Sequence, residues 1–107
     1  MSKVKRKLTT ILATDCVGFS KRMDENEELT LENLKACRSI IDPQIKEFGG
    51  RIFYTAGDSV IAEFESPVEC VNAAIGFQKA INDRNNTLPQ ESQLDWRVGI
   101  HLSLIHI

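Results

Sequence analysis

The sequence predicts an α+β domain: a ferredoxin-like βαββαβ sandwich with an antiparallel sheet and its helices on one face. Two segments have helical periodicity, the other apolar runs have the β-branched or alternating pattern of strands, and the order is strand–helix–strand–strand–helix–strand. Right-handed crossovers leave few other topologies for this order. The 107 residues, of which 42% are hydrophobic and 26% charged, suit one domain with an ordinary core.

The first strand and turn are predicted from composition. Residues 7–14 (KLTTILAT) have the β-branched enrichment of a buried strand, and residues 15–20 (DCVGFS) follow as a turn. Residues 24–50 then have the periodicity of a helix, and Asp24 or Asn26 is expected to cap its start. Its apolar face is formed by Leu31, Leu34, Cys37, Ile41, Ile45 and Phe48.

Glycine and proline punctuate the middle of the chain. Gly49 and Gly50 are expected to end the first helix, and Pro43 to kink it or divide it into two abutting helices. Residues 51–64 (RIFYTAGDSVIAEF) predict a hairpin that turns around residues 56–59.

The second half of the chain repeats the helix–strand order. Residues 66–86 predict a helix with a Ser66–Glu69 capping box and Pro67 at its first position. A polar loop is expected over 85–93. A strand is expected next, with one alternating apolar face formed by Leu94, Trp96, Val98, Ile100, Leu102 and Leu104.

Two aspartates, 43 residues apart, are expected to meet. In this topology the third strand lies between the first and the second, so the turn that carries Asp58 reaches the end of the strand that carries Asp15. Two carboxylates ~4 Å apart repel by ~4 kcal/mol at an effective dielectric of ~20, and a shared proton, an arginine or a divalent cation would offset this. Carboxylate oxygens suit Mg²⁺ or Mn²⁺, and the Gly-containing turn at 17–20 can direct backbone N–H groups at phosphate. Each aspartate alone would be an ordinary turn or cap residue; together they indicate a metal–phosphate site for phosphoryl transfer.

Net charge and cysteine usage narrow the possible binding partners and the cellular location. The net charge of −2 gives no electrostatic support for nucleic-acid binding, and the basic run at residues 1–6 is expected to be a solvated tail. Three widely spaced cysteines suggest neither a disulfide framework nor a zinc site, and favour the cytoplasm. The apolar run at 8–13 is too short for a signal peptide or a membrane span, so no membrane contact is expected from this segment.

The motifs on these elements resemble the N-terminal half of class III adenylate/guanylate cyclase catalytic domains, above all bacterial ones that begin with this domain. The similarity runs from Lys7 to Leu102. It is carried by D-x-V-G-[FY]-S at 15–20, G-G-R at 49–51, T-A-G-D-S-V-x-A-E-F at 55–64 and R-V-G-I-H-L at 97–102. The family's fold is the one predicted above.

The resemblance implies a role for each matching residue. Asp15, Asp58 and the backbone carbonyl of Cys16 would hold two Mg²⁺ or Mn²⁺ ions, and Gly18, Phe19 and Ser20 would lie along the triphosphate. The reaction would convert ATP or GTP to a 3′,5′-cyclic nucleotide and pyrophosphate, in intracellular signal transduction. Active members are dimers with sites shared between subunits, so a homodimeric parent protein is implied.

The sequence departs from the family pattern at two places. Four residues before Asp58, where adenylate-specific members often have a lysine that reads the base, this chain has Tyr54; it is a strand aromatic or a weak base contact. The family continues past R-V-G-I-H-L with a hairpin that carries further base-reading and transition-state residues, whereas this chain continues S-L-I-H-I. Codons that would encode residues 102–107 match a sequencing-library adapter, so 7–102 is expected to be a partial cyclase domain and 103–107 a non-native tail. His101 and His106 therefore receive no catalytic role.

Four functions remain open. The first is an enzyme, a metal-dependent purine nucleotide cyclase of which this inactive chain is the N-terminal part. The second is a non-catalytic nucleotide-binding regulatory homologue, which the presence of both aspartates disfavours. The third, a diguanylate cyclase or polymerase of related topology, would need a G-G-[DE]-E-F turn where A-G-D-S stands. The fourth is a ferredoxin-like interaction module.

Overall fold

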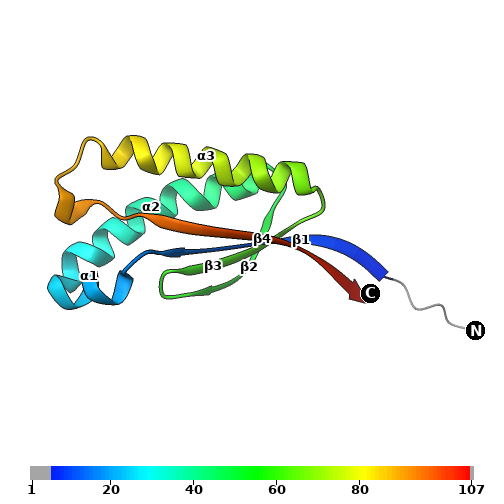
Figure 1. The fold of residues 1–107 in the computed structure, drawn as a ribbon, viewed down its shortest axis with the longest axis horizontal. Coiled ribbons are helices and arrows are strands. Elements are labelled where there is room, and N and C mark those ends of the chain that lie inside the picture. Colours follow the sequence, from blue (N-terminus) through cyan, green and yellow to red (C-terminus); the bar gives the residue numbers. More distant parts are fainter. Residues whose placement is uncertain (1–5, 107) are drawn as a thin grey trace, which may run out of the picture.

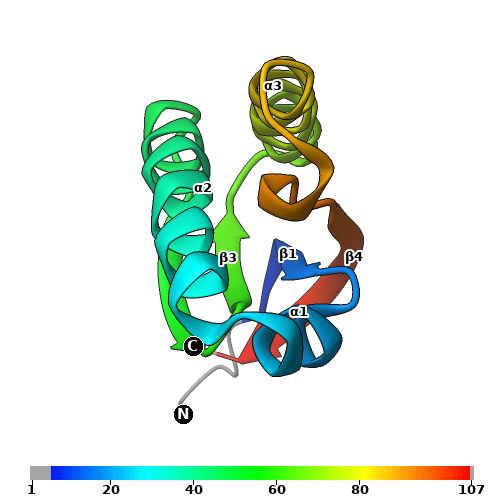
Figure 2. The same ribbon diagram turned by 90° about the vertical axis from the view of Figure 1, so that its left-hand side faces the viewer.

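The computed structural model describes residues 6–106, and its elements follow the predicted order (Figure 1). They are β1 (Arg6–Cys16), α1 (Phe19–Glu25), α2 (Glu27–Glu47), β2 (Arg51–Ala56), β3 (Ser59–Phe64), α3 (Pro67–Asn85), the 3₁₀ helix η1 (Gln90–Ser92) and β4 (Trp96–His106). Helices α2 and α3 lie on the same side of the sheet (Figure 2). The predicted fold class is confirmed.

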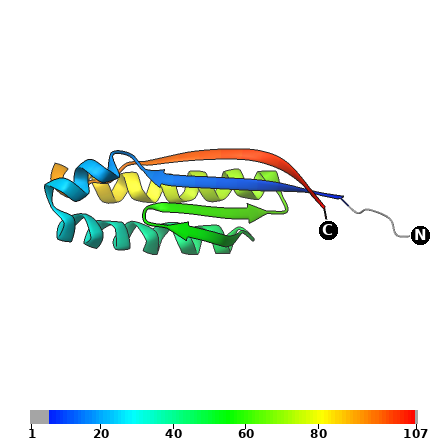
Figure 3. The same ribbon diagram turned by 90° about the horizontal axis from the view of Figure 1, so that it is seen from below.

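The four strands form one antiparallel sheet in the order β2–β3–β1–β4. The third strand therefore lies between the first and the second, as the ferredoxin-like topology requires. The longest ladder joins β1 to β4, from Cys16↔Trp96 to Arg6↔His106. Both strands extend well beyond the short β2–β3 hairpin (Figure 3).

The core lies between the helices and one face of the sheet. Along β1, Leu12, Thr14 and Cys16 are buried while Ala13 between them is exposed, which is the period-two pattern of a sheet with one covered face. The largest fully buried side chains include Phe64 of β3 and Phe77 of α3. The opposite face of the sheet carries no helix, and Asp15 lies on it.

The first helical segment differs from the prediction at its start. The chain divides at Asn26, whose side chain accepts a hydrogen bond from the Leu29 N–H (3.1 Å), and the short helix α1 precedes this break. Asn26 is thus the cap, one of the two candidates. Helix α2 continues through Pro43, so the predicted division there is wrong. Pro43 lies on the exposed side of α2, where water can satisfy the carbonyl that a proline leaves unpaired.

The buried face of α2 is rotated at its N-terminal end. Leu31, predicted to be core, is 45% exposed, whereas Thr30 and Asn33 are buried. The Thr30 hydroxyl donates to the Arg22 carbonyl of α1 (2.9 Å), and Asn33 Oδ1 accepts from Arg84 Nη2 of α3 (2.7 Å). These hydrogen bonds allow two polar side chains to replace a leucine in the core. Cys37, Ile41 and Ile45 are buried as predicted.

The other predicted turns and caps are confirmed in outline. The hairpin turns at residues 57–58, and Gly49, which follows the C-cap of α2, has φ +82°. Ser66 Oγ accepts from the Glu69 N–H (3.2 Å) at the start of α3. The polar loop contains η1, which the sequence did not indicate. Within residues 6–106, none of the helices combines the length and apolarity needed to cross a bilayer.

Strand β4 is only partly covered. Leu94 and Trp96 are buried and Val98 is partly buried, but Ile100, Leu102 and Leu104 are 39%, 57% and 56% exposed. The predicted alternation is therefore confirmed, but the apolar face is buried only at its start, because β4 extends beyond the ends of the helices (Figure 3). Residues 103–106 continue β4 in register with β1. The basic tail expected at 1–6 lies outside the described residues except for Arg6, which begins β1.

Candidate active site

Asp15 and Asp58 meet at one end of the sheet, as the topology predicts. Asp15 is the penultimate residue of β1, and Asp58 lies in the β2–β3 turn, where Gly57 has the left-handed φ of +57° that a tight turn requires. The Asp58 side chain reaches across to β1, where its Oδ2 accepts a hydrogen bond from the Cys16 N–H (2.9 Å). The turn aspartate is thus bonded to the residue next to Asp15.

The two aspartates line one cavity of about 520 Å³. Its wall is formed by Asp15, Cys16, Gly18, Phe19, Ser20, Lys21, Asp58, Ser59 and Arg97. Every residue that the sequence analysis placed along metal or triphosphate is in this set, whereas Tyr54, the weak base contact, is not. Elements far apart in the sequence (the end of β1, the start of α1, the β2–β3 turn and β4) therefore build a single concave surface.

Arg97 is a site residue that the sequence analysis missed. It faces Asp15 directly across the β1–β4 ladder, and its Nε donates to Asp15 Oδ1 at 2.8 Å. The signal was present in the alternation of β4, because Arg97 is the polar residue between the inward-facing Trp96 and Val98 on a strand adjacent to β1. One of the three possible offsets for the paired aspartates, a nearby arginine, is therefore present in the chain itself.

Cys16 is buried directly beside the carboxylates. Burial, and after it the Asp58 carboxylate, raises the pKa of the Cys16 thiol to about 12. The thiol is therefore protonated at neutral pH, and its side chain belongs to the hydrophobic core. The group of Cys16 that the resemblance assigns to a cation is its backbone carbonyl.

Gly18 forms the bend between β1 and α1. Its φ of +65° and ψ of +30° are left-handed, a backbone conformation that residues other than glycine adopt only at an energetic cost. It serves as the N-cap of α1, and no side chain caps the backbone N–H groups of the first turn, whose residues line the cavity. Phe19 and Ser20 follow in the first turn of that helix.

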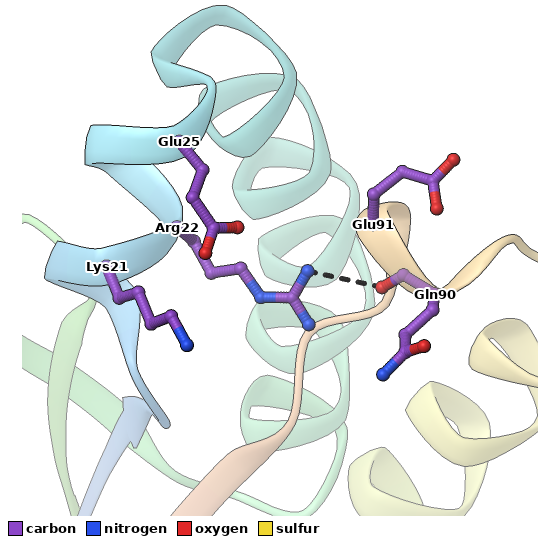
Figure 4. A pocket seen from close by; sticks show the side chains of 5 residues that line it. All are labelled: Lys21, Arg22, Glu25, Gln90 and Glu91. Atoms are coloured by element: carbon purple, nitrogen blue, oxygen red, sulfur yellow. Dashed lines mark hydrogen bonds between the residues drawn. The ribbon is translucent and has the colours of Figure 1, made fainter.

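Helix α1 is held in place from its other side. A second cavity, of about 320 Å³, is lined by Lys21, Arg22, Glu25, Gln90 and Glu91, and there Arg22 Nη1 donates to the Gln90 carbonyl at 3.2 Å (Figure 4). Two basic and two acidic side chains line it, so it has no net preference for an anion or a cation. The Arg22–Gln90 hydrogen bond joins α1, which also lines the cavity of the two aspartates, to η1.

Tyr54 is not brought into the aspartate cavity. A β-bulge between Ile52 and Tyr54 pairs Tyr54 with Ile61, which in turn pairs with Ala13 of β1. Tyr54 therefore lies on the sheet face that no helix covers, and it is 53% exposed. That is the same face as Asp15, but a different part of it.

The donor set at the cavity fits a hard divalent cation that retains other oxygen ligands. Among residues 6–106 there is no cluster of three or more His, Cys, Asp or Glu side chains that could hold a metal ion. Mg²⁺ characteristically binds through one or two carboxylates and completes its shell with phosphate and water oxygens. Asp15 and Asp58 supply such a pair, so the residues fit a metal that arrives with a phosphate substrate.

Two curated proteins with similar sequences are both much longer than this chain. No protein-family model matches the chain. It is 35% identical over 105 residues to "Putative adenylate cyclase 3" of Rhizobium meliloti (strain 1021), covering 97% of this chain and 18% of that protein. It is 30% identical over 101 residues to serine/threonine-protein kinase pkn2 of Myxococcus xanthus, covering 94% of this chain and 12% of that protein. The chain thus spans less than a fifth of the curated relatives it matches.

Solved structures show the same fold over nearly the whole chain. The adenylate/guanylate cyclase/hydrolase from Silicibacter pomeroyi superimposes with a TM-score of 0.85 at 33% identity, covering 98% of this chain and 62% of that one. The resemblance to class III adenylate/guanylate cyclase domains is confirmed. The adenylyl cyclase CyaB from P. aeruginosa, at 22% identity, shows the cyclase fold alone, with a TM-score of 0.79 over 98% of this chain and 60% of that one. This chain is therefore matched from β1 to β4, and it covers 60–62% of these two cyclase structures.

Proposed function

We propose that this chain is the N-terminal part of a metal-dependent nucleotidyl cyclase that converts ATP or GTP to a 3′,5′-cyclic nucleotide and pyrophosphate. The observation that carries the proposal is the convergence of Asp15 and Asp58 on one cavity, with the Asp58 carboxylate bonded to the Cys16 N–H. The likeness to the cyclase from Silicibacter pomeroyi, at 33% identity, supports the reaction class.

The residues of the cavity have complementary tasks in this proposal. Asp15, Asp58 and the Cys16 carbonyl hold two Mg²⁺ or Mn²⁺ ions, which supply charge neutralisation at the triphosphate and activation of the 3′-hydroxyl as nucleophile. Gly18, Phe19 and Ser20 position the triphosphate, because the bend at Gly18 leaves backbone N–H groups unpaired at the start of α1. Lys21 and Arg97 are the cationic side chains of the same wall and favour a polyanion.

Turnover is proposed for a protein longer than these 107 residues. The matched structure is longer than this chain, which covers 62% of it, and the sequence motifs end before the segment that in the family completes the site. We propose that the parent protein works as a homodimer in the cytoplasm, where three buried, unpaired cysteines are stable, and that the 107 residues alone make no cyclic nucleotide.

The base that the enzyme accepts depends on groups outside the aspartate cavity. Tyr54 stands where a base-reading lysine occurs in adenylate-specific members, and it offers one hydroxyl in place of an ammonium group. A site that hydrogen-bonds a substrate group can discriminate by orders of magnitude. Comparing ATP with GTP in the parent protein, before and after Tyr54→Phe, measures whether that hydroxyl contributes.

A second candidate, a binding-only regulatory domain, draws on the same geometry. Both carboxylates already have protein partners, Arg97 for Asp15 and the Cys16 N–H for Asp58, so both could serve structure alone. The two candidates differ in what the charges do. A structural aspartate can be replaced by asparagine at low cost, whereas a metal-binding one cannot.

The test is an assay of the parent protein with Mn²⁺ and ATP or GTP. Asp15→Asn and Asp58→Asn are each expected to abolish cyclic nucleotide formation, because asparagine keeps the hydrogen bond but loses the charge that holds the ion. Circular dichroism of both variants controls for folding. Retained activity in either variant contradicts the metal assignment, and cyclic nucleotide formation by the 107-residue chain contradicts the proposal that it is incomplete.

A further inference from the structure

Asp15, one of the proposed metal ligands, forms an ion pair with Arg97. The two residues are direct partners in the β1–β4 ladder, and Arg97 Nε lies 2.8 Å from Asp15 Oδ1. Their side chains are 40% and 69% exposed, respectively. An ion that takes Asp15 Oδ1 as a ligand must therefore displace the guanidinium group.

The backbone around this pair is fixed, so displacement concerns the arginine side chain only. The Thr14 hydroxyl donates to the Arg97 carbonyl at 2.7 Å, and the Val17 N–H donates to the Asp95 carbonyl at 2.8 Å. These bonds extend the register of β1 and β4 on both sides of the pair. The Arg97 side chain, by contrast, lies mostly in solvent and can adopt other rotamers at little cost.

The two aspartates differ in the kind of partner they have. The partner of Asp58 is a backbone N–H that is fixed by the fold, and it takes Oδ2. The partner of Asp15 is a cation on a flexible, exposed side chain. Within residues 6–106 these are the only hydrogen bonds found to either carboxylate, so an ion that approaches Asp15 Oδ2 still meets the Arg97 charge held at Oδ1.

We propose that Arg97 is a displaceable internal counterion of Asp15, which holds that carboxylate when no divalent cation is bound and lowers the affinity of the site for the cation. The inference rests on the proposed function, because it takes Asp15 to be a metal ligand. It adds that metal binding at this site is an exchange of one cation for another. Exposed ion pairs shift equilibria by about two- to five-fold, which makes Arg97 a weak competitor that a divalent ion can replace.

If the cation displaces Arg97, variants at this position should change the affinity of the site for the cation in a specific order. Arg97→Gln removes both the competing bond and the repulsion between the guanidinium group and the incoming ion, so the cation should bind more tightly. Arg97→Lys keeps a cation able to pair with Asp15 and should bind nearly as the wild type does. Lys21→Gln removes a charge from the same cavity wall without removing a bond to Asp15, so it measures the effect of charge alone.

The experiment is a titration of the 107-residue chain with Mn²⁺, followed by electron paramagnetic resonance of the free ion. We expect the Kd of Arg97→Gln to be about two- to five-fold below that of the wild type, with a smaller change for Lys21→Gln and less than a two-fold change for Arg97→Lys. In parallel, the Arg97 Nε–H resonance of the wild type should move toward that of a solvated arginine on addition of Mg²⁺.

Asp15→Asn separates failure of this inference from failure of the proposed function. Loss of Mn²⁺ binding in Asp15→Asn supports the metal site. The exchange is then refuted if Arg97→Gln binds Mn²⁺ no more tightly than Lys21→Gln, or if the Arg97 Nε–H resonance does not move on addition of Mg²⁺. If Asp15→Asn binds Mn²⁺ as the wild type does, Asp15 is not a ligand, and both the metal assignment and the exchange are refuted.

Discussion

Asp58 accepts a hydrogen bond from the backbone N–H of Cys16, 42 residues earlier in the chain, at 2.9 Å. The bond fastens the tip of the β2–β3 hairpin to the end of β1, directly beside Asp15. The carboxylate at the tip of this hairpin therefore has a structural task in addition to its proposed role as a metal ligand. The two tasks can be separated by substitution.

Removing the Asp58 acceptor should loosen the hairpin. Asp58→Ala leaves the Cys16 N–H without its partner in a partly buried setting, so we expect the free energy of unfolding to fall by about 1–2 kcal/mol. Asp58→Asn keeps an acceptor oxygen and should lose less than half of that. Urea denaturation measures both. Equal stability of wild type and Asp58→Ala would show that the bond does not hold the hairpin.

Gly50 tests how closely the end of α2 is packed against the sheet. A Cβ atom on Gly50 would overlap the Phe64 ring and lie 2.7 Å from Ile45 Cγ2, both in the core. Gly50→Ala should therefore lower the free energy of unfolding by about 1–3 kcal/mol. Gly99→Ala is the matched control, since the atom nearest to its Cβ would be the Ala13 carbonyl oxygen at 4.0 Å. Equal melting temperatures for Gly50→Ala and Gly99→Ala would refute this packing.

The buried thiols predict a loss of stability at alkaline pH. Burial raises the pKa of Cys70 to about 11 and, with Asp58, that of Cys16 to about 12, from 9.0. Because the folded-state pKa lies above the unfolded one, the unfolded chain releases these protons first. The stabilisation is complete below pH 9 and is lost as pH rises through the folded-state values.

Each such thiol contributes a slope of at most ~1.4 kcal/mol per pH unit above pH 9. Urea denaturation between pH 7 and pH 10.5 measures this slope. Cys70→Ala should reduce the slope, and it should also lower the free energy of unfolding at pH 7. An identical slope for Cys70→Ala and the wild type would show that this thiol ionises as easily in the folded chain as in the unfolded one.

The uncovered half of β4 predicts self-association of the 107-residue chain. Strand β4 is an edge strand, and Ile100, Leu102 and Leu104 present apolar side chains next to unpaired backbone groups. Sedimentation velocity should show concentration-dependent association that Leu102→Lys weakens. Val68→Lys, at a 67% exposed position on α3 without a strand edge, is the control. A chain that stays monomeric, or a Leu102→Lys variant that associates as the wild type does, would contradict this prediction.

The convergence of Asp15 and Asp58 was predictable because it depends only on strand order, which the helical and strand periodicities determine. The break at Asn26 was not predictable in position, since Asp24 and Asn26 are equally good caps and only tertiary packing of α1 decides between them. The bulge before Tyr54 has no signature in an apolar strand. Arg97 was overlooked because alternation shows which face it occupies but not which residue of β1 it meets.

Paramagnetic broadening of ¹H–¹⁵N spectra of the chain on addition of Mn²⁺ shows whether Asp15 and Asp58 together bind a divalent cation. If they do, amides of residues 15–20 and 57–59 broaden first, and Asp15→Asn and Asp58→Asn each remove this pattern. Broadening that begins elsewhere, or that persists at these amides in both variants, would contradict this binding.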